Sequence, residues 1–576
     1  MGTVFSSLAA PFKLVKSLVT VLKTLEADFS AVAKRAKAPP PLPHAAPTQP
    51  FWLLDPPHPE LVDIQSQELP HEAEVVIIGS GITGAAVARS LLQSAQSQRQ
   101  KLPGEHDEHD EAVPRKGLPR VVVLEARQLC SGATGRNGGH IKATAYETVG
   151  RLLKQGAITG ERAAELVRFQ LRHLPVLTGL CAAEGIGAAE CREVDTVDLF
   201  VDNEEGLRTT LEEVEALRKW VPEFEVRTWT ADEACEKFKV NHHVVGAISY
   251  KAGALWPYRL VSSVWKNLLK EFPDSLSIET NTPATSISVL GGTNASAPPP
   301  PGALQPDEYF PYLVTTPRGA IRARHVVHAT NAYTGHLVPG LHGKTTGVLA
   351  HMSAQRPGID FPRTCGSRSW GFVYAGQAFD YVTQRPGTTE APGELMIGGG
   401  FTCAPKQGAD MVGVYDDSRL DALTVAHLEG IMPAVFRPRW GADEAGGGPR
   451  VKDVWSGVIA FTADLLPLVG RLDEQTTGRR VPTRKGEERK TSSGSSVGEP
   501  NPGEWISAGY CGEGMIWAWL SGTAVGLMLS GCENVSLPAA PGRPEGRLAD
   551  WFPAELRPTR ERIARMDIMD LADNVM

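Results

Sequence analysis

A glycine-spaced turn between an apolar run and a small-residue run is the first feature of this sequence that could bind a ligand. The stretch EVVIIGSGITGAAVARSLL (74–92) contains the spacing G-x-G-x-x-G. The first glycine permits the turn, the second lets the backbone approach a phosphate, and the third lets the following helix pack against the strand. The N-terminus of that helix then faces a pyrophosphate. The pattern predicts a dinucleotide site formed by Gly79, Gly81, Ile82, Thr83 and Gly84.

An acidic residue closes the next apolar run, RVVVLEAR (120–127). In dinucleotide sites of this kind, a carboxylate at the end of the second strand accepts a hydrogen bond from a ribose hydroxyl. Glu125 occupies this position, although it lies about twice as far from the glycines as the usual spacing of ~20 residues. The acidic insertion at 99–117 accounts for the difference, and Ala126 and Arg127 complete the expected ribose end of the site. Within that insertion, His106, Asp107, His109 and Asp110 indicate solvated charge rather than a metal site.

A second glycine-rich loop, LCSGATGRNGGHI (129–141), follows directly. Its glycines would let backbone amides lie against phosphates and a flat ring. The side chain of Arg136 would add a cation for the phosphates or for a reduced ring. The expected contacts are Gly132, Ala133, Thr134, Arg136, Asn137, Gly138 and Gly139.

Together, these segments resemble the D-amino-acid oxidase-like (DAO) family of FAD-dependent oxidoreductases, closest to the branch that includes gamma-glutamylputrescine oxidoreductase. Four further stretches are similar to family segments in the family's order: GALWPYRL (253–260), ARHVVHATNAYTGHL (323–337), VWSGVIAFTADLLPLVGRL (454–472) and WISAGYCGEGMIWAWLSG (505–522). The resemblance covers about residues 70–535. It implies cofactor contacts at Ala329, Thr330, Asn331, Gly457, Asp464, Gly512, Glu513, Gly514 and Met515.

The resemblance implies an α/β fold in which a discontinuous Rossmann-like FAD-binding domain carries a second, antiparallel β-rich substrate domain. It also implies a reaction: hydride passes from a carbon beside an amine nitrogen to flavin N5, the imine hydrolyses, and oxygen or another acceptor reoxidises the flavin. Two alternatives stay open. One is a hydroxy-acid or glycerol-phosphate-type dehydrogenase on the same fold, and the other is a non-catalytic FAD-bound scaffold at a membrane surface.

Two departures from the family pattern bear on the cofactor and the substrate. Relatives that attach FAD covalently carry a cysteine at the position of Gly457 or a histidine at the position of Arg136. We therefore expect this chain to bind FAD as a non-covalent cofactor. Relatives of the glycine oxidase type hold a substrate carboxylate with an arginine where this chain has Ile459. Without that bidentate clamp, a small α-amino acid is a less suitable substrate than an amine with no adjacent carboxylate.

We assign no catalytic base from the sequence. Aromatic side chains beside a flavin can surround an alkylated amine, and each of them could equally be an ordinary core residue. The candidates for the substrate pocket are Trp256, Tyr258, His351, Trp370, Tyr374 and Tyr381.

The elements that must position these residues follow from hydrophobic periodicity and turn signals. We predict strands at 75–79, 120–125, 196–202, 285–290, 325–330, 395–400 and 505–509, and helices at 83–96, 160–185, 204–220, 259–272, 420–432 and 515–530. Gly522 and Gly526 indicate close backbone packing of the last helix inside a soluble core. No internal repeat is evident.

The predicted organisation is discontinuous. Residues 1–36 form an amphipathic helix or leader and 37–60 a proline-rich linker. The FAD-binding domain comprises 61–160, 256–345 and 451–535, the last with an insertion at 473–504. The substrate domain comprises a helical segment at 161–255 and residues 346–450, and a C-terminal extension spans 536–576. A further polar insertion is expected at 291–308.

Composition sets broad limits on class and location. The formal charge of -8 and the 42% hydrophobic content argue for a globular protein and against a general nucleic-acid surface. None of the eight cysteines forms a CxxC pair, which favours reduced thiols in an intracellular protein, most simply cytoplasmic. Lysines interleaved with apolar residues before position 30 leave open peripheral membrane contact, a packed helix or a disordered leader.

Overall fold

The computed structural model describes residues 28–100, 117–156, 158–290, 309–374, 378–442, 449–481 and 500–571. Most of the three expected insertions, with the His106–Asp110 cluster, and the first 27 residues lie outside the described residues. All eight cysteines are described and unbridged.

The first of two sheets has eight strands, ordered β16-β17-β10-β1-β2-β7, with β9 and β8 added beside β10. Its centre is parallel, and the bounds are β1 (Glu72–Ile78), β2 (Val121–Leu124), β7 (Leu276–Glu279), β10 (Gly319–His328) and β17 (Gly503–Ala508). The antiparallel additions are β8 (Ser286–Val289), β9 (Tyr312–Thr316) and β16 (Leu468–Arg471). Parallel strands are stable only when both faces are covered, and every residue of β2 is buried.

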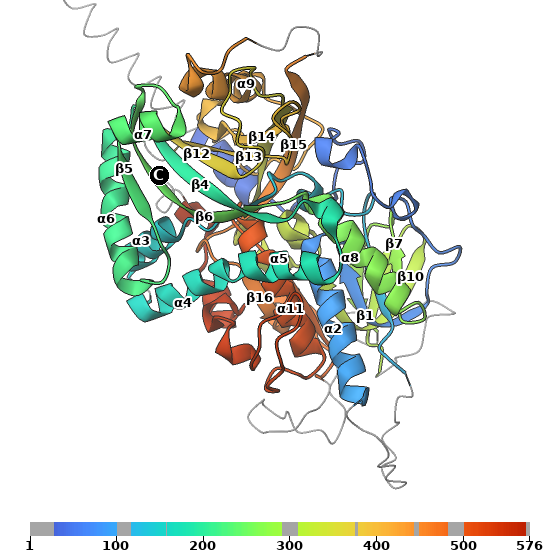
Figure 1. Cartoon of the computed structure of the whole chain (residues 1–576). Helices are drawn as coiled ribbons and strands as arrows, with labels where there is room; N and C mark the ends of the chain where they lie inside the picture. The colour runs from blue at the N-terminus through green and yellow to red at the C-terminus, as the bar shows by residue number, and fades with distance from the viewer. Residues whose placement is uncertain are drawn as a thin grey trace, which may run out of the picture.

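Helices α2 (Ile82–Gln100), α8 (Pro257–Glu271) and α11 (Ala518–Leu529) pack around this first sheet (Figure 1). A Cβ added at Gly522 would lie 2.7 Å from the Thr83 carbonyl oxygen, and one at Gly526 would lie 2.6 Å from Ser90 Cβ. The two glycines therefore let α2 and α11 approach closely, as predicted. No helix of the described residues is long and apolar enough to cross a membrane.

The second sheet has nine strands, ordered β15-β11-β14-β13-β12-β4-β6-β3, with β5 beside β6. Every pair is antiparallel except β4 with β12. The bounds are β3 (His140–Ile141), β4 (Arg192–Val201), β5 (Arg227–Thr230), β6 (Val244–Ala254), β11 (Thr345–Gln355), β12 (Arg368–Tyr374), β13 (Ala378–Gln384), β14 (Leu395–Gly399) and β15 (Val451–Thr462).

Helices pack against both faces of this second sheet (Figure 1). One core joins β4 and β6 to α3 (Ala145–Gln155), α4 (Gly160–Leu171) and α6 (Glu204–Trp220). A second core joins β12–β14 to α7 (Ala231–Phe238) and α9 (Ala422–Phe436). Further helices of the described residues are α5 (His173–Ala183), α10 (Glu474–Thr477), α12 (Arg560–Arg565) and one at 28–37.

All the predicted helices and strands are present, with one helix divided. The run predicted at 160–185 breaks between α4 and α5, around Arg172. The strands that were not predicted, such as β6 and β11, contain glycine, serine and alanine, which weaken the strand pattern in a single sequence. The strand β15 begins the predicted third FAD segment but pairs with β11 in the second sheet, so it connects the two parts of the molecule.

Candidate active site

The glycine turn after β1 is packed too tightly for any side chain. Gly79 has a φ of 112°, and a Cβ there would lie 2.5 Å from the Ala329 carbonyl oxygen at the end of β10. A Cβ at Gly84 would lie 2.0 Å from the carbonyl oxygen of Gly79, so this third glycine lets α2 begin directly against β1. The N-terminus of α2 therefore points along the carboxyl edge of the parallel sheet, where α/β folds bind ligands.

Two side chains organise this turn. The carboxylate of Glu125 accepts hydrogen bonds from the Ser80 backbone N (3.1 Å), from Ser80 Oγ (2.6 Å) and from the Arg127 backbone N (3.1 Å). The hydroxyl of Thr134, in the second glycine loop, accepts a hydrogen bond from the Ile82 backbone N at 3.0 Å. The acidic residue and the second loop are thus both held against the first turn of α2.

A cavity of about 2180 Å³ begins at this turn and extends between the two sheets. All the predicted cofactor residues line it except Gly84, Gly139 and Asp464. Gly139 has a φ of 63° and turns the chain against Leu255, whose carbonyl oxygen would lie 2.2 Å from an added Cβ. Asp464 instead forms an ion pair with Arg562 of α12, at 2.7 Å, which fixes the turn after β15.

Arg136 lines the cavity, and protein acceptors also bind its guanidinium. Its guanidinium donates to the carbonyl oxygens of Ser131 (2.9 Å), Ser456 (2.8 Å) and Thr48 (2.8 Å). Burial lowers the pKa of this guanidinium to about 10, and neighbouring Asp417 opposes the shift. Arg136 therefore ties the second glycine loop to β15 and to the N-terminal segment, and its N–H groups are used by protein acceptors.

Two of the six pocket candidates, His351 and Tyr381, line the cavity. The ring of Tyr381 covers Gly138, where an added Cβ would lie 2.3 Å from the ring. His351 Nε2 accepts a hydrogen bond from the Asp421 backbone N at 2.9 Å, which positions the start of α9.

The other four candidates are not part of the cavity lining. Trp256 packs against Trp52, Tyr258 is buried in the core around α8, and Trp370 packs against Phe361 and Phe436. The Tyr374 hydroxyl donates to Asp380 at 3.1 Å and lies 3.1 Å from His427. The fact that a residue is aromatic was not enough to distinguish core residues from residues that line the cavity.

Comparison with known proteins identifies the family of this chain. The profile of the family described as "FAD dependent oxidoreductase" (DAO) matches residues 74–526, which is most of the chain. The chain belongs to this family. The FAD-dependent oxidoreductase fold and the cofactor, FAD, are those expected from the sequence.

Solved structures share the fold at low sequence identity. Glycine oxidase from Geobacillus kaustophilus superposes with a TM-score of 0.53 at 17% identity, over 85% of this chain and 99% of that one. L-proline dehydrogenase from P. horikoshii gives 0.52 at 18% identity, over 80% and 94%. Iminodiacetate oxidase from Chelativorans sp. BNC1 gives 0.51 at 15% identity, over 82% and 98%.

One curated relative matches a short region. A protease HtpX homolog from Pelotomaculum thermopropionicum is 35% identical over 104 residues, which are 18% of this chain and 36% of that protein. The chain thus spans about a third of that relative's length, and the match carries no argument about activity.

The residues of this oxidoreductase fit FAD. The glycines of the first turn leave room for a pyrophosphate, Glu125 offers carboxylate oxygen beside it, and the second loop lines the continuation of the cavity towards the second sheet. The glycine loop at 512–515 lines the same cavity from the side of α11. These groups would hold the two ends of the cofactor.

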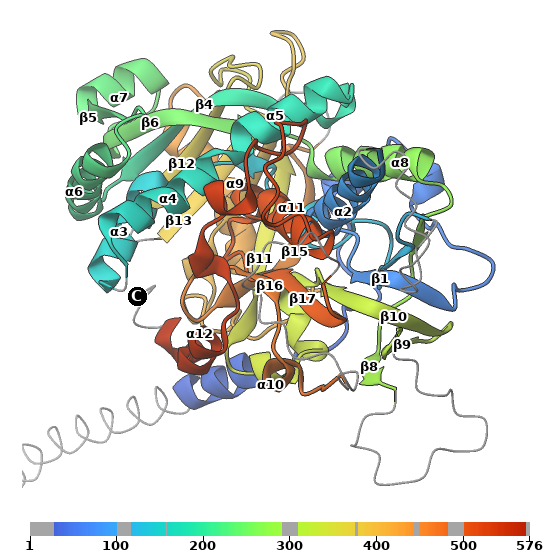
Figure 2. The same cartoon turned by 90° about the horizontal axis from the view of Figure 1, so that it is seen from below.

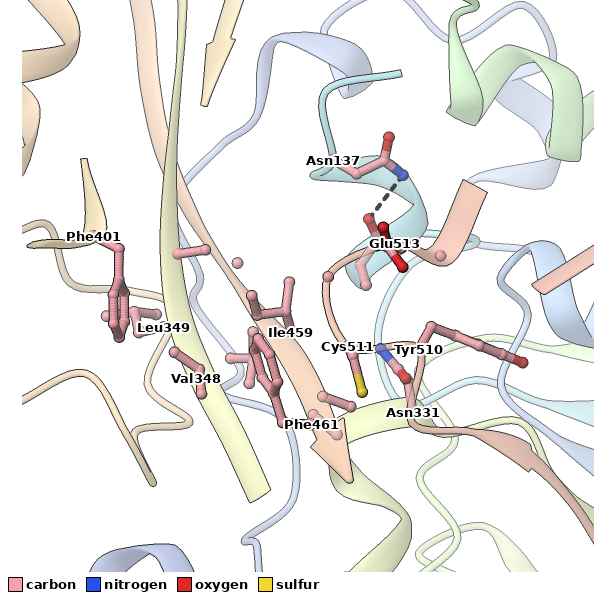
Figure 3. Close-up of a pocket in the computed structure, with 18 of the residues that line it drawn as sticks. Asn137, Asn331, Val348, Leu349, Phe401, Ile459, Phe461, Tyr510, Cys511 and Glu513 are labelled. Carbon is pink, nitrogen blue, oxygen red and sulfur yellow. Dashed lines mark hydrogen bonds between the residues drawn. The ribbon is translucent and has the colours of Figure 1, made fainter. Parts of the chain in front are cut away.

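One wall of the cavity, from the second sheet, is apolar. Val348 and Leu349 on β11, Ile459 and Phe461 on β15, and Phe401 lie along it (Figure 3). Ile459 pairs with Val348 in the sheet register, and an added Cβ at Gly512 would lie 3.8 Å from its Cδ1. Ile459 therefore borders the closing glycine loop, and it supplies no hydrogen-bond donor there.

Charged and hydroxyl groups on β4, on α3 and directly after β3 line another part of the cavity. The carboxylate of Asp198 accepts hydrogen bonds from the hydroxyls of Tyr146 and Tyr250, both at 2.7 Å, and is ion-paired with Lys142. Burial and this carboxylate raise the pKa of both tyrosines well above their usual value. No local pattern indicates this network, because its four members come from four separate segments: β4, β6, α3 and the chain directly after β3.

Three further charged side chains of the cavity are not paired in that network. Glu147 and Arg151 lie one turn apart on α3, and Glu513 lies in the closing glycine loop; all three line the cavity. Burial, and then Asp198, raise the pKa of Glu147 to about 8. Burial also raises the pKa of Glu513, against an opposing effect of Arg151. A helical periodicity search of α3 could have placed Glu147 and Arg151 on one face, but not beside the cofactor loop.

Proposed function

We propose that this protein oxidises the C–N bond of an amine that carries an apolar substituent, with non-covalently held FAD as the hydride acceptor. The observation that carries the proposal is the continuity of one cavity from the dinucleotide turn to a pocket that has an apolar wall and also contains charged side chains. When bound, FAD takes up a hydride from the carbon beside nitrogen, and the resulting imine hydrolyses to a carbonyl product and a released amine.

The apolar wall supports an amine without an adjacent carboxylate. A carboxylate placed against Val348, Ile459 and Phe461 would lose its water without gaining a hydrogen bond, which is unfavourable. Alkyl or aryl groups would instead bury apolar surface there, at about 25 cal/mol per Å².

Two acidic side chains of the cavity support binding of the nitrogen. Glu147 and Glu513 present carboxyl groups to the cavity, and such groups accept hydrogen bonds from an ammonium or amine N–H. With a pKa of about 8, Glu147 can hold or release a proton within the physiological range. In its ionised form, which predominates above pH 8, its side chain is suited to accept the proton that a bound ammonium must lose before oxidation.

Several finer points are part of the same proposal. Neither Gly457 nor Arg136 can form a bond to the cofactor, which supports non-covalent binding. The GATGRNGG loop supports a place near the gamma-glutamylputrescine oxidoreductase-like branch. Oxygen as acceptor, an intracellular location and peripheral membrane contact through residues 1–36 rest on the sequence alone, and cell fractionation tests the last two.

Anaerobic titration of the purified yellow protein tests the proposal. Primary and secondary amines with alkyl or aryl groups should bleach the flavin band, and readmitted air should restore it with formation of peroxide. Bleaching by 2-hydroxy acids or glycerol phosphate, but by no amine, would establish the dehydrogenase alternative. A flavin that no compound of either class reduces would support the scaffold alternative and refute the proposal.

A further inference from the structure

The proline-rich segment expected to be a linker is attached to the cofactor site. We call residues 36–50 the N-terminal strap; a helix at 28–37 leads into it and lies beside α12 (Figure 2). Arg35 of this helix donates to the carbonyl oxygens of Val412 (3.1 Å) and Ala409 (2.9 Å), and Lys37 forms an ion pair with Asp567 at 3.0 Å. The strap thus begins from a fixed point.

Two hydrogen bonds place the strap across the carboxyl edge of the first sheet. His336, in the turn after β10, donates from Nδ1 to the Pro40 carbonyl oxygen at 3.0 Å. Arg127, directly after β2, donates from Nη1 to the His44 carbonyl oxygen at 3.2 Å. Because β1 lies between β10 and β2 in the sheet, the strap passes over the glycine turn that follows β1.

The dimensions agree with this path. Strands β10 and β2 are two strand spacings apart, which is roughly 10 Å. Four residue steps of extended, proline-rich chain span about 12 Å. The chain between the two anchors is therefore long enough to cross from β10 to β2 in an extended conformation.

The residues between the anchors face the cavity. Pro41, Leu42 and Pro43 all line it, in common with Gly79, Glu125 and Arg127. Leu42 remains exposed, as a side chain on the wall of an open cavity is. Proline has no backbone N–H to satisfy and loses little conformational freedom when it is fixed, so this sequence suits an ordered strap.

A second attachment closes the downstream end of the strap. Thr48 N donates to the Asp417 carbonyl oxygen at 2.8 Å, and Thr48 Oγ1 accepts from the Ser456 backbone N at 3.0 Å. Arg136 donates to the Thr48 carbonyl oxygen at 2.8 Å. The arginines after β2 and in the second glycine loop therefore both bind the strap.

We propose that the N-terminal strap forms the outer wall of the FAD site over its adenosine half, and that FAD leaves only when the strap detaches. Apolar contact from Pro41, Leu42 and Pro43 encloses that half from the side opposite the glycine turn. This enclosure retains a cofactor that neither Gly457 nor Arg136 can bond covalently.

The rate of FAD release tests the proposal. The test variant of the holoenzyme combines Pro40→Gly, Pro41→Gly and Pro43→Gly. It keeps the anchoring carbonyl groups of residues 40 and 44 but makes the strap flexible. We expect FAD to dissociate at least tenfold faster, followed by the rise in flavin fluorescence after dilution. The matched control is Pro538→Gly, Pro541→Gly and Pro544→Gly, in a segment that does not line the cavity; its release rate should equal that of the wild type.

A second measurement covers the case in which the strap variant does not fold. Saturating FAD should slow trypsin cleavage after Lys37 in the wild-type protein at least fivefold. The reason is that an attached strap cannot enter the active site of the protease as an extended segment. Release rates within twofold of the control, or equal cleavage with and without FAD, would overturn the proposal. A lower melting temperature without faster FAD release would also overturn it, because the strap would then be only structural.

Discussion

Protonation of His173 should weaken the junction between α5 and α11. This side chain is fully buried, its Nδ1 donates to the Phe169 carbonyl oxygen at 3.0 Å, and its Nε2 accepts from the Leu520 backbone N at 3.2 Å. Both contacts require the neutral ring with its proton on Nδ1. A second proton on Nε2 would oppose the Leu520 N–H in the first turn of α11, just after the closing glycine loop.

The loss of unfolding free energy on acidification follows from the pKa of His173. Burial lowers the pKa of His173 from 6.5 to about 4, so between these values the unfolded chain binds a proton that the folded chain does not. The contribution of His173 to stability is therefore complete above pH 6.5 and is lost as the pH falls towards 4. At 1.36 kcal/mol per pH unit, His173 alone should remove roughly 3 kcal/mol of unfolding free energy across that window.

Urea unfolding of the holoenzyme, measured from pH 7.5 to 4, tests this value. His173→Gln removes the titration, so its stability should be lower at pH 7.5 but should fall by about 3 kcal/mol less than that of the wild type on acidification. His243→Gln is the control, because His243 is exposed beside Asp202. An H173Q profile parallel to that of the wild type would refute the reasoning.

Three further predictions concern the site. Gly79→Ala should weaken FAD binding at least a hundredfold by fluorescence titration, because its Cβ would lie 2.5 Å from a carbonyl oxygen, whereas Gly179→Ala, with nothing within 4 Å, should not. Ile459→Arg should allow glycine-type amino acids to bleach the flavin anaerobically; no reduction would show that the clamp position is elsewhere. Glu147→Gln should remove an ionisation near pH 8 from the pH profile of flavin reduction, with Glu212→Gln unchanged; a profile identical to that of the wild type would exclude Glu147 as the proton acceptor.

Local sequence was sufficient to predict the cofactor. The glycine turn, the residue Glu125 after β2 and the glycine loop at 129–141 act through backbone geometry and short spacing, so their roles follow from neighbouring residues. The same locality explains why the helices and strands with strong periodicity were predicted within a few residues, whereas β6 and β11, which contain small residues, were not.

Other features depended on contacts between distant segments. The charge of Arg136 predicts a contact with the phosphates or the ring, but the sequence does not indicate that the carbonyl oxygens of Thr48 and Ser456, 88 and 320 residues away, also bind its guanidinium. Trp370 and Tyr381 are both aromatic residues of the second sheet, and only packing puts the first in a core and the second on the cavity.

The sequence by itself determined the fold class, the cofactor and the family, because these depend on motifs that each act within one segment. The tertiary structure decided the walls of the substrate cavity, the pairing of Asp198 with Lys142 and two tyrosines, and the course of the strap across the glycine turn. Each of these joins side chains or backbone groups from separate elements. Their electrostatics and packing depend on distances in space that no spacing along the chain specifies.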